Sequence, residues 1–453
     1  MKLIYKLFIF LTVIIISVNT SFAFTNQKID KLIEKSDLSK TSTIAISVRN
    51  VSTGNVVYEK DAKKLLHPAS TIKIPASYFA INTLGYDYFF KTGFYKYNKD
   101  LYIKLGADPL LTFGQLKSAF SQLKSQGLDN FENLYIDDSI IDKKEFSQGW
   151  MWDDDVNPYT PKVSAYNLDG NSIKLNMTTK DDGTVKTSLN SKYPMSIYAY
   201  IKKDANGEFL DVNRYNWNNP ELVEIYGKVN NTQSVKVPIS SMRRYFIYNI
   251  DKILDEKRIT VKSSLYASKI IPQNADLIYE ISNPIEPVIS EILQNSNNLM
   301  AETIYKLAGG MDYNSTGTDE NAFMAMAKFY QKDNVDFNSV VLKDGCGVSR
   351  NNLVSVDWMS NILIKIYKDK NFEKFKEYMA QPGDGTLSSR LFDLRGDAWL
   401  KTGSLSNISA LAGYIKSKDG NLYAITIYTQ NFKLNQKEVK KFEDEIVTLI
   451  YNR

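Results

Sequence analysis

The first part of the chain carries two successive hydrophobic patterns. From Ile44 to Val48, apolar residues alternate with small or polar ones, and a Ser-Thr-Gly-Asn turn follows before the alternation resumes. This pattern predicts a β-hairpin over residues 43–59. A helical spacing then covers 70–83, where Pro75 is tolerated because it lies near the first turn. The folded part of the chain is therefore expected to begin with a hairpin and a helix.

The middle of the chain changes to short strand-like runs. Three of these runs lie at 101–104, 134–137 and 172–177, and helical segments lie at 113–126 and 244–256. After the third run, Asp-Gly, Asn-Gly and Asn-Asn turns separate short alternating stretches up to about residue 240. Turns of this kind between short strands predict a small all-β unit.

The C-terminal part returns to helical spacing after Glu286 and then to strands. These strands are expected at 398–401, 413–417 and 422–428. A final helix is expected at 435–451, and its apolar stripe indicates packing against a protein core rather than a membrane.

The sequence of patterns divides the chain into an outer domain and an insert that is itself split. The outer domain combines N-terminal and C-terminal parts, because helical and strand patterns of similar character flank the insert. The expected units are an outer domain of 24–95 and 265–453, an inserted α/β domain of 96–172 and 235–264, and a nested β domain of 173–234.

Residues 1–23 have the pattern of an export signal. Lys2 and Lys6 precede an apolar run over 7–18, and a Ser-Phe-Ala sequence ending at Ala23 has small residues at the two positions that a signal peptidase reads. An uncleaved anchor is the alternative, but the run is shorter than the roughly 20 residues needed to span a bilayer. We expect cleavage after Ala23 and a soluble periplasmic protein with at most peripheral membrane association.

Among 453 residues, the chain has one His and one Cys, and these counts exclude several kinds of chemistry. A zinc site built on His, an internal disulfide and a Cys-x-x-Cys redox pair would each need more such residues. The net charge of +5, from 56 basic and 51 acidic residues, is too small and too dispersed to indicate nucleic-acid binding. We therefore expect no metal and no other cofactor, and a hydrolase whose general base is not His.

Three short motifs carry candidate chemistry. Ser70 and Lys73 form a Ser-x-x-Lys at a predicted helix start, where the i to i+3 spacing places both side chains on one face. A desolvated lysine there can take the proton of the serine without any His. Ser296 and Asn298 form a Ser-x-Asn inside a helical stretch, where a polar break could present a hydroxyl and an amide to a cleft.

The third motif is Lys401-Thr402-Gly403, followed by Ser404, at the end of an expected edge strand. A lysine, hydroxyls and free backbone N–H groups can together hold a carboxylate and an oxyanion. Each motif alone is weak because the chain contains other copies. These copies are Ser121-x-x-Lys124, Ser188-x-Asn190, Ser349-x-Asn351 and Lys91-Thr92-Gly93. The prediction therefore rests on the order of the three motifs along the chain and on the structural context of each.

In this order the three motifs resemble those of the active-site serine penicillin-recognising enzymes. The long insert narrows the resemblance to the class C low-molecular-mass penicillin-binding proteins, which are serine D-Ala-D-Ala carboxypeptidases and endopeptidases. Further matching segments lie at 105–109, 150–152, 344–353 and 383–387. The chain departs from this family at Cys346, where Ser is usual, and at Ser406, where a larger polar residue is common.

The resemblance implies an α/β (α+β) serine penicillin-recognising fold, with an antiparallel sheet flanked by helices and two smaller nested domains. It implies that Ser70 attacks the bond between the two terminal D-alanines of a peptidoglycan stem peptide, and that β-lactams acylate the same serine. Lys73, its pKa lowered by Lys401 and by desolvation, would take the serine proton. Ser296 would relay a proton to the departing nitrogen.

The resemblance also implies a set of substrate contacts. Backbone N–H groups of Ser70 and Ser404 would form the oxyanion hole, and Asn298 would hold the substrate amide. The residues expected to bind the terminal carboxylate and the polar end of the stem peptide are Thr402, Gly403, Ser404, Arg350, Asp154 and Tyr159. Asp154 is equally well explained as a solvated acid in an acidic run.

Two alternatives stay open at this point. A serine β-lactamase would share the motifs, but no Glu-x-x-Leu-Asn lies between Ser296 and Lys401, and the insert would have no role. A non-catalytic peptidoglycan-binding scaffold could retain the fold, but all three motifs are intact. The sequence leaves the oligomeric state open.

Overall fold

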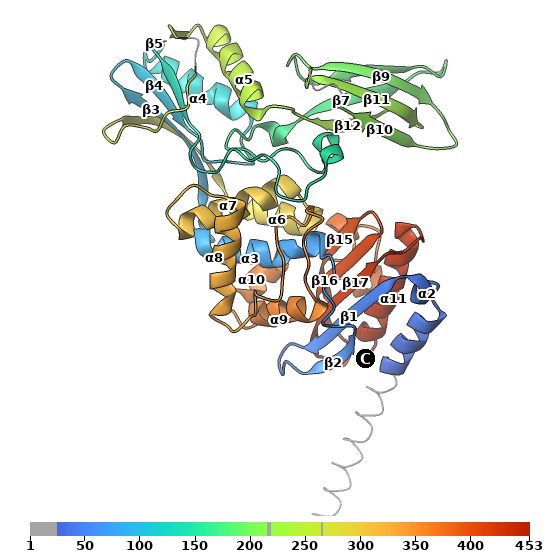
Figure 1. Ribbon diagram of the computed structural model, residues 1–453. Coiled ribbons are helices and arrows are strands. Elements are labelled where there is room, and N and C mark those ends of the chain that lie inside the picture. The colour runs from blue at the N-terminus through green and yellow to red at the C-terminus, as the bar shows by residue number, and fades with distance from the viewer. Residues whose placement is uncertain (1–24, 215–218, 264–265) are drawn as a thin grey trace, which may run out of the picture.

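A computed structural model describes residues 25–214, 219–263 and 266–453 (Figure 1). The predicted export signal and its cleavage position lie outside these described residues. Within the three described ranges, no helix combines the length and the apolar character needed to cross a membrane.

The outer domain is built on a five-stranded antiparallel sheet with the strand order β15-β16-β17-β1-β2. The strands are β1 (Thr43–Asn50), β2 (Val56–Lys60), β15 (Ala398–Leu405), β16 (Ile408–Lys416) and β17 (Leu422–Gln430). The predicted hairpin and the three predicted C-terminal strands are thereby confirmed. β15 lies at one edge of the sheet, as expected for the strand that carries Lys401.

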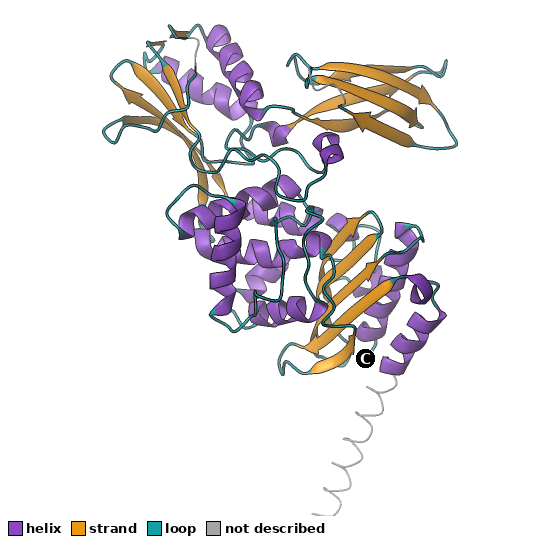
Figure 2. Cartoon of the chain, in the orientation of Figure 1, coloured by secondary structure: helices purple, strands orange, loops and turns teal. Residues whose placement is uncertain are grey.

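Helices cover both faces of this sheet (Figure 2). One face packs against α11 (Gln436–Tyr451) and a helix at 25–35, and the apolar stripe of α11 lies in this core as predicted. The other face contacts α9 (Val356–Tyr367), and β15 and β16 contact the 3-10 turn that immediately precedes α3 (Lys73–Leu84). The sheet edge at β15 therefore lies beside the helical layer that contains the Ser-x-x-Lys motif.

The predicted helix over 70–83 is present in two parts. A 3-10 turn, η1 (Ala69–Ile72), leads directly into α3. Pro75 is the third residue of α3, where a missing N–H removes no intrahelical bond. The other helices of the outer domain are α2 (Leu38–Thr41), α6 (Glu286–Asn295), α7 (Asn298–Asp312), α8 (Asp319–Gln331) and α10 (Phe372–Glu377).

The α/β part of the insert contains a four-stranded sheet of order β14-β3-β4-β6. Its elements are β3 (Phe89–Tyr97), β4 (Asp100–Lys104), α4 (Phe113–Ser125), β5 (Asn130–Phe131), β6 (Leu134–Asp137), α5 (Met242–Lys257), β13 (Thr260–Val261) and β14 (Asp276–Pro284). β3 and β14 pair with each other, whereas the expected outer domain includes part of β3 and all of β14. We therefore propose that the insert begins before β3 and ends after β14. Lys91-Thr92-Gly93 lies within β3, in this sheet rather than the outer one.

The predicted all-β unit is present as two three-stranded sheets, of orders β12-β7-β8 and β10-β11-β9. The strands are β7 (Ser172–Thr179), β8 (Val185–Leu189), β9 (Ser196–Lys203), β10 (Phe209–Asn213), β11 (Leu222–Val229) and β12 (Gln233–Pro238). β11 pairs with β9 in parallel, and β10 pairs with β11 in antiparallel fashion. This unit extends away from the outer domain at the upper right of Figure 1.

Candidate active site

Ser70 follows a residue with an unusual backbone conformation. Ala69 has a positive φ of 45°, which side-chain-bearing residues rarely adopt. The backbone N–H of Ala69 donates to Nδ1 of His67 at 2.9 Å, so Nε2 carries the proton and donates to the carbonyl oxygen of Ser349 at 2.6 Å. Burial lowers the pKa of His67, which is consistent with this neutral ring. Both ring nitrogens of the single His thus support the turn before Ser70.

Two glycines allow other segments to approach this turn closely. A Cβ atom on Gly347 would lie 2.0 Å from the carbonyl oxygen of Ala69. A Cβ atom on Gly403 would lie 2.9 Å from the Cβ of Ala69 and 3.0 Å from the backbone nitrogen of Ser70. Any side chain at either position would push these segments apart. The third motif and the loop around Cys346 therefore both press against the Ser70 turn.

Lys73 is fully buried and contacts the Ser70 hydroxyl. Its Nζ donates to Ser70 Oγ at 2.9 Å and to Asn298 Oδ1 at 2.5 Å, and it also donates to the carbonyl oxygen of Cys346. Burial lowers the pKa of Lys73, because the charged ammonium loses its hydration. A neutral amine in this position can accept the proton of Ser70.

Lys401 is also fully buried, and its Nζ donates to the carbonyl oxygen of Thr402 at 2.9 Å. Burial, together with the charge of Lys73, holds the pKa of Lys401 well below its usual range. Of the two causes expected to lower the pKa of Lys73, burial is confirmed, whereas the charge of Lys401 is not among the causes. The negative charges of Asp344 and Glu302 favour the protonated form of Lys73. Both lysines therefore lose a proton more readily than an ordinary lysine does.

The edge of β15 presents free backbone donors. The N–H of Leu400 points away from β16 and donates to the carbonyl oxygen of Ala380 at 2.9 Å. Because N–H directions alternate along a strand, the N–H groups of Thr402 and Ser404 point to the same open edge. Ser404 is exposed, and the Thr402 hydroxyl has no hydrogen-bond partner among the described residues. These N–H groups can therefore donate hydrogen bonds to an anionic oxygen.

The second motif forms the turn between α6 and α7. Ser296 has a left-handed backbone with φ of 63°, and its hydroxyl has no hydrogen-bond partner within the described chain. Asn298 instead bridges two segments, since its Oδ1 accepts from Lys73 and its Nδ2 donates to the carbonyl oxygen of Tyr159 at 2.7 Å. The structure thus ties Asn298 to Lys73 but shows no bond from Ser296 to either lysine.

Arg350, Asp154 and Tyr159 lie on segments that reach the same region. The backbone N–H of Arg350 donates to the carbonyl oxygen of Gly149 at 3.0 Å, and its half-buried guanidinium has no hydrogen bond or ion pair to any described residue. Asp154 lies in the 3-10 turn η2 (Trp152–Val156), and burial raises its pKa while the charge of Arg350 opposes this. The Tyr159 side chain is 77% exposed, so this residue contacts the motifs through its backbone.

The segment around Cys346 is organised by a buried carboxylate that the motif search did not single out. Asp344 accepts the backbone N–H groups of Gly347 at 2.9 Å, Val348 at 3.0 Å and Ser349 at 2.6 Å. It also accepts the indole N–H of Trp150 at 2.8 Å. The loop therefore wraps around one side chain, and the matching segments 150–152 and 344–353 meet at it.

Cys346 is buried, and burial raises the pKa of its thiol well above the usual range. It serves the site through its carbonyl oxygen, which accepts from Lys73. Its Sγ lies within 4.8 Å of carboxylate oxygens of Glu302 and Asp344, a grouping that resembles a metal site. However, backbone N–H groups occupy these carboxylates and the thiol stays protonated, so the donor set does not suit a cation.

Glu302 is a further buried carboxyl that sequence reasoning missed. It accepts the backbone N–H of Gly345 at 2.9 Å and that of Cys346 at 3.1 Å, and Ser147 Oγ lies 3.2 Å away. Burial raises the pKa of Glu302 well above its usual range. The side chain fixes the two peptides that precede the Cys346 carbonyl, so it helps to hold this carbonyl in place beside Lys73.

We expect Glu302→Ala to lower the free energy of unfolding by about 1–3 kcal/mol, because two buried N–H groups lose their acceptor. The same change should slow acylation of Ser70, since the Cys346 carbonyl is no longer held on Lys73. Glu302→Gln keeps an oxygen for these N–H groups and serves as the matched control. Denaturant unfolding and the rate of penicillin acylation measure the two effects. Acylation at the wild-type rate in Glu302→Ala would contradict the positioning role.

Comparisons with known proteins show which family the sequence matches. The sequence model of the family described as D-Ala-D-Ala carboxypeptidase 3 (S13) matches residues 25–453. The D-alanyl-D-alanine carboxypeptidase DacB of Haemophilus influenzae is 23% identical over 437 residues, which cover 92% of this chain and 91% of that protein.

Solved structures show the same fold. The crystal structure of penicillin binding protein 4 (dacB) from Haemophilus influenzae matches with a TM-score of 0.81 at 21% identity, over 94% of this chain and 99% of that chain. The structure of the same protein complexed with a novel β-lactam matches with a TM-score of 0.77 at 20% identity, over the same shares.

Proposed function

Because the chain belongs to the D-Ala-D-Ala carboxypeptidase 3 (S13) family, we propose that Ser70 is the nucleophile of a serine D-Ala-D-Ala carboxypeptidase. Membership makes the chain a hydrolase with the serine penicillin-recognising fold. The observation that carries the residue assignment is the fully buried Lys73, whose Nζ lies 2.9 Å from Ser70 Oγ. This pairing supplies nucleophile and base without any His.

In the acylation step, Ser70 Oγ attacks the carbonyl carbon of the penultimate D-Ala while Lys73 Nζ takes the hydroxyl proton. Negative charge then develops on the carbonyl oxygen, and the backbone N–H groups of Ser70 and Ser404 stabilise it. The open β15 edge and the contact of Gly403 with the Ser70 nitrogen support this oxyanion hole. The peptide bond to the terminal D-Ala breaks as the departing nitrogen gains a proton.

Lys73 passes the proton that it took from Ser70 through the Ser296 hydroxyl to the departing nitrogen, with the buried Lys401 nearby. The unengaged hydroxyl of Ser296 supports this relay. Water then attacks the ester carbon, Lys73 takes a proton from the water, and Ser70 regains its own proton. Thr402 and Ser404 hold the terminal carboxylate of the substrate at the edge of β15.

Recognition of the stem peptide involves the segments around Arg350 and Asp154. The guanidinium of Arg350 has no ion pair with any described carboxylate and remains available for a carboxylate of the substrate. Nδ2 of Asn298 uses one of its two N–H donors on the Tyr159 carbonyl, so the second can bind the substrate amide.

The proposed substrates are peptidoglycan peptides that end in D-Ala-D-Ala, in a periplasmic setting. The same acyl-enzyme can form when the acyl donor is a cross-link between two stems, so we propose D,D-endopeptidase activity as well. β-Lactams acylate Ser70 because they mimic the acyl donor. The structure in complex with a novel β-lactam, which matches this fold, supports that expectation.

Digestion of purified muropeptides should release free D-Ala from pentapeptides and monomers from cross-linked dimers. Chromatography of the products with mass detection measures both reactions. Rapid hydrolysis of penicillin without release of D-Ala would favour the β-lactamase alternative. Binding to peptidoglycan with neither cleavage nor penicillin labelling would favour the non-catalytic scaffold.

A further inference from the structure

The outer face of the sheet β10-β11-β9 is an ordered array of side chains. Burial alternates along all three strands, so that Val223 and Ile225 point into the β unit while their neighbours point outward. The pairing register places the outward residues in three rows across the strands. These rows are Asn213-Glu224-Tyr198, Asp211-Tyr226-Tyr200 and Phe209-Lys228-Lys202.

Four of these nine positions carry exposed aromatic rings, and we call this surface the tyrosine face. The exposed fractions are 55% for Tyr198, 59% for Tyr200, 58% for Phe209 and 39% for Tyr226. Tyr200 and Tyr226 stack with their ring centroids 4.9 Å apart and an interplanar angle of 10°. Exposed aromatic side chains gathered on a single face of a soluble protein indicate a binding surface.

The chemistry of the tyrosine face favours a sugar chain over a lipid or an apolar protein surface. Carboxylates at Glu224 and Asp211 and ammonium groups at Lys202 and Lys228 alternate with the rings. Covering these charges with an apolar partner would cost their hydration. A pyranose ring offers apolar C–H faces to the tyrosine rings and hydroxyl groups to the charged neighbours, so it satisfies both kinds of position.

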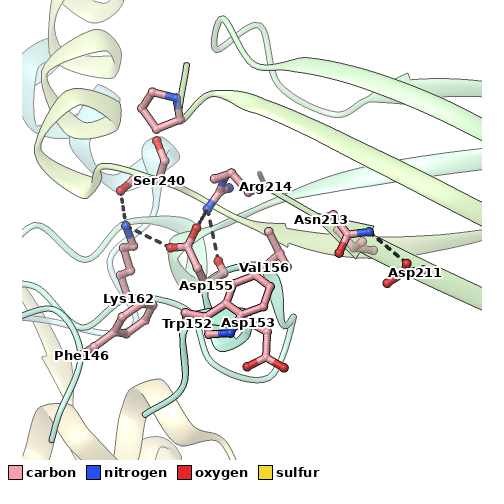
Figure 3. A pocket seen from close by; sticks show the side chains of 12 residues that line it. Phe146, Trp152, Asp153, Asp155, Val156, Lys162, Asp211, Asn213, Arg214 and Ser240 are labelled. Atoms are coloured by element: carbon pink, nitrogen blue, oxygen red, sulfur yellow. Dashed lines mark hydrogen bonds and ion pairs between the residues drawn. The ribbon is translucent and has the colours of Figure 1, made fainter. Parts of the chain in front are cut away.

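The tyrosine face adjoins a cavity that is also lined by residues of the 3-10 turn η2. Asp211 and Asn213 belong to the face and also line a cavity of about 630 Å³ (Figure 3). Trp152 and Asp153 of η2 line the same cavity. Asp154 follows Asp153 in η2. The chain then continues to Tyr159, whose carbonyl oxygen accepts a hydrogen bond from Asn298.

The cavity is held in shape by partly buried charges. Arg214 donates to Asp155 Oδ2 at 2.6 Å, and Lys162 lies 3.2 Å from Asp155 Oδ1. Lys162 also donates to the carbonyl oxygen of Ser240 at 2.6 Å. These contacts join η2 to the β unit, so the tyrosine face has a defined position relative to Ser70.

We propose that the tyrosine face and the adjoining cavity bind the glycan strand to which the stem peptide is attached. The stem peptide occupies the Ser70 site while its own sugar chain extends across the cavity onto the stacked Tyr200 and Tyr226. This inference rests on the proposed function, because it assigns the inserted β unit to the same substrate. It makes the enzyme more active on polymeric peptidoglycan than on isolated peptides.

The test uses the double variant Tyr200→Ala/Tyr226→Ala and two substrates. Release of D-Ala from a soluble pentapeptide should stay at the wild-type rate, because this peptide does not reach the tyrosine face. Binding to peptide-free glycan strands and the rate of D-Ala release from intact sacculi should both fall about tenfold or more, since central aromatic contacts dominate such interfaces. Tyr200→Phe/Tyr226→Phe retains the rings and should keep most of the binding.

Tyr313→Ala is the matched control, because Tyr313 is 40% exposed but lies at the end of α7. Equal binding of glycan strands by the wild type and the double alanine variant would overturn the proposal. Absence of glycan binding by a wild-type enzyme that cleaves pentapeptide normally would also overturn it. Failure to cleave pentapeptide and to react with penicillin would instead refute the proposed function.

Discussion

Covalent labelling by a fluorescent penicillin is expected to disappear in Ser70→Ala and to persist in Ser121→Ala. Both residues begin a Ser-x-x-Lys, but only Ser70 has its hydroxyl 2.9 Å from a buried lysine amine. Ser121 donates to the carbonyl oxygen of Lys117 at 2.8 Å within α4, and Lys124 donates to the carbonyl oxygen of Arg258 at 3.1 Å. The two changes are chemically identical, so their difference reports on the site alone.

Gel electrophoresis after penicillin treatment, together with intact-protein mass spectrometry, measures this result. Thermal unfolding of both variants shows whether the fold is retained. Labelling of Ser70→Ala at the wild-type stoichiometry would show that another residue is the nucleophile. Loss of labelling in Ser121→Ala with an unchanged unfolding temperature would contradict the choice between the two motif copies.

The sequence could predict those parts of the site whose chemistry is local. Ser70 and Lys73 share a helical turn, so their spacing alone places them together. The edge position of Lys401 followed from the strand pattern and the following Gly403. The resemblance to a family predicted that these segments and Asn298 share one site, because no local pattern relates residues so far apart in the chain.

The buried carboxylates could not be predicted in the same way. Glu302 follows an apolar run in α7, and a single Glu in a helix normally indicates a solvated face. α7 is buried around most of its surface, because α3, α6 and α8 all pack against it. The role of Asp344 likewise depends on the hydrogen bonds that it accepts from Trp150 and from its own loop. Tertiary packing decides the role of both residues.

Strand pairing limited the prediction of domains. The run at 101–104 is recognisable as a strand, but its neighbour β3 also pairs with β14, which comes from the opposite end of the insert. A boundary drawn where the residue pattern changes therefore cuts through a sheet. The parallel pairing of β9 with β11 is similarly invisible in the alternation of either strand, yet this pairing brings Tyr200 beside Tyr226.

Lys73→Arg is expected to slow acylation of Ser70 by about 10²–10⁴-fold, the usual contribution of a positioned base. Arginine keeps the positive charge and the hydrogen-bonding capacity, but its guanidinium stays protonated and cannot accept the serine proton. In the wild type, burial lowers the pKa of Lys73, so a neutral amine is available at a lower pH than for an ordinary lysine. The acylation rate should therefore rise with pH and level off below pH 10.5, the unperturbed lysine value.

Stopped-flow measurement of the penicillin acylation rate between about pH 5 and 10 tests this expectation, because the charges of the two lysines change with pH. The rising limb reports on Lys73 and Lys401 together, because the charge of Lys73 opposes protonation of Lys401. Lys73→Arg should lose the limb as well as the rate, and Lys124→Arg, in the second Ser-x-x-Lys, should retain both. A wild-type rate that is flat across this range, or an active Lys73→Arg, would mean that another group removes the proton. In that case Lys401 is the next residue to substitute, because its lowered pKa would also allow it to take a proton.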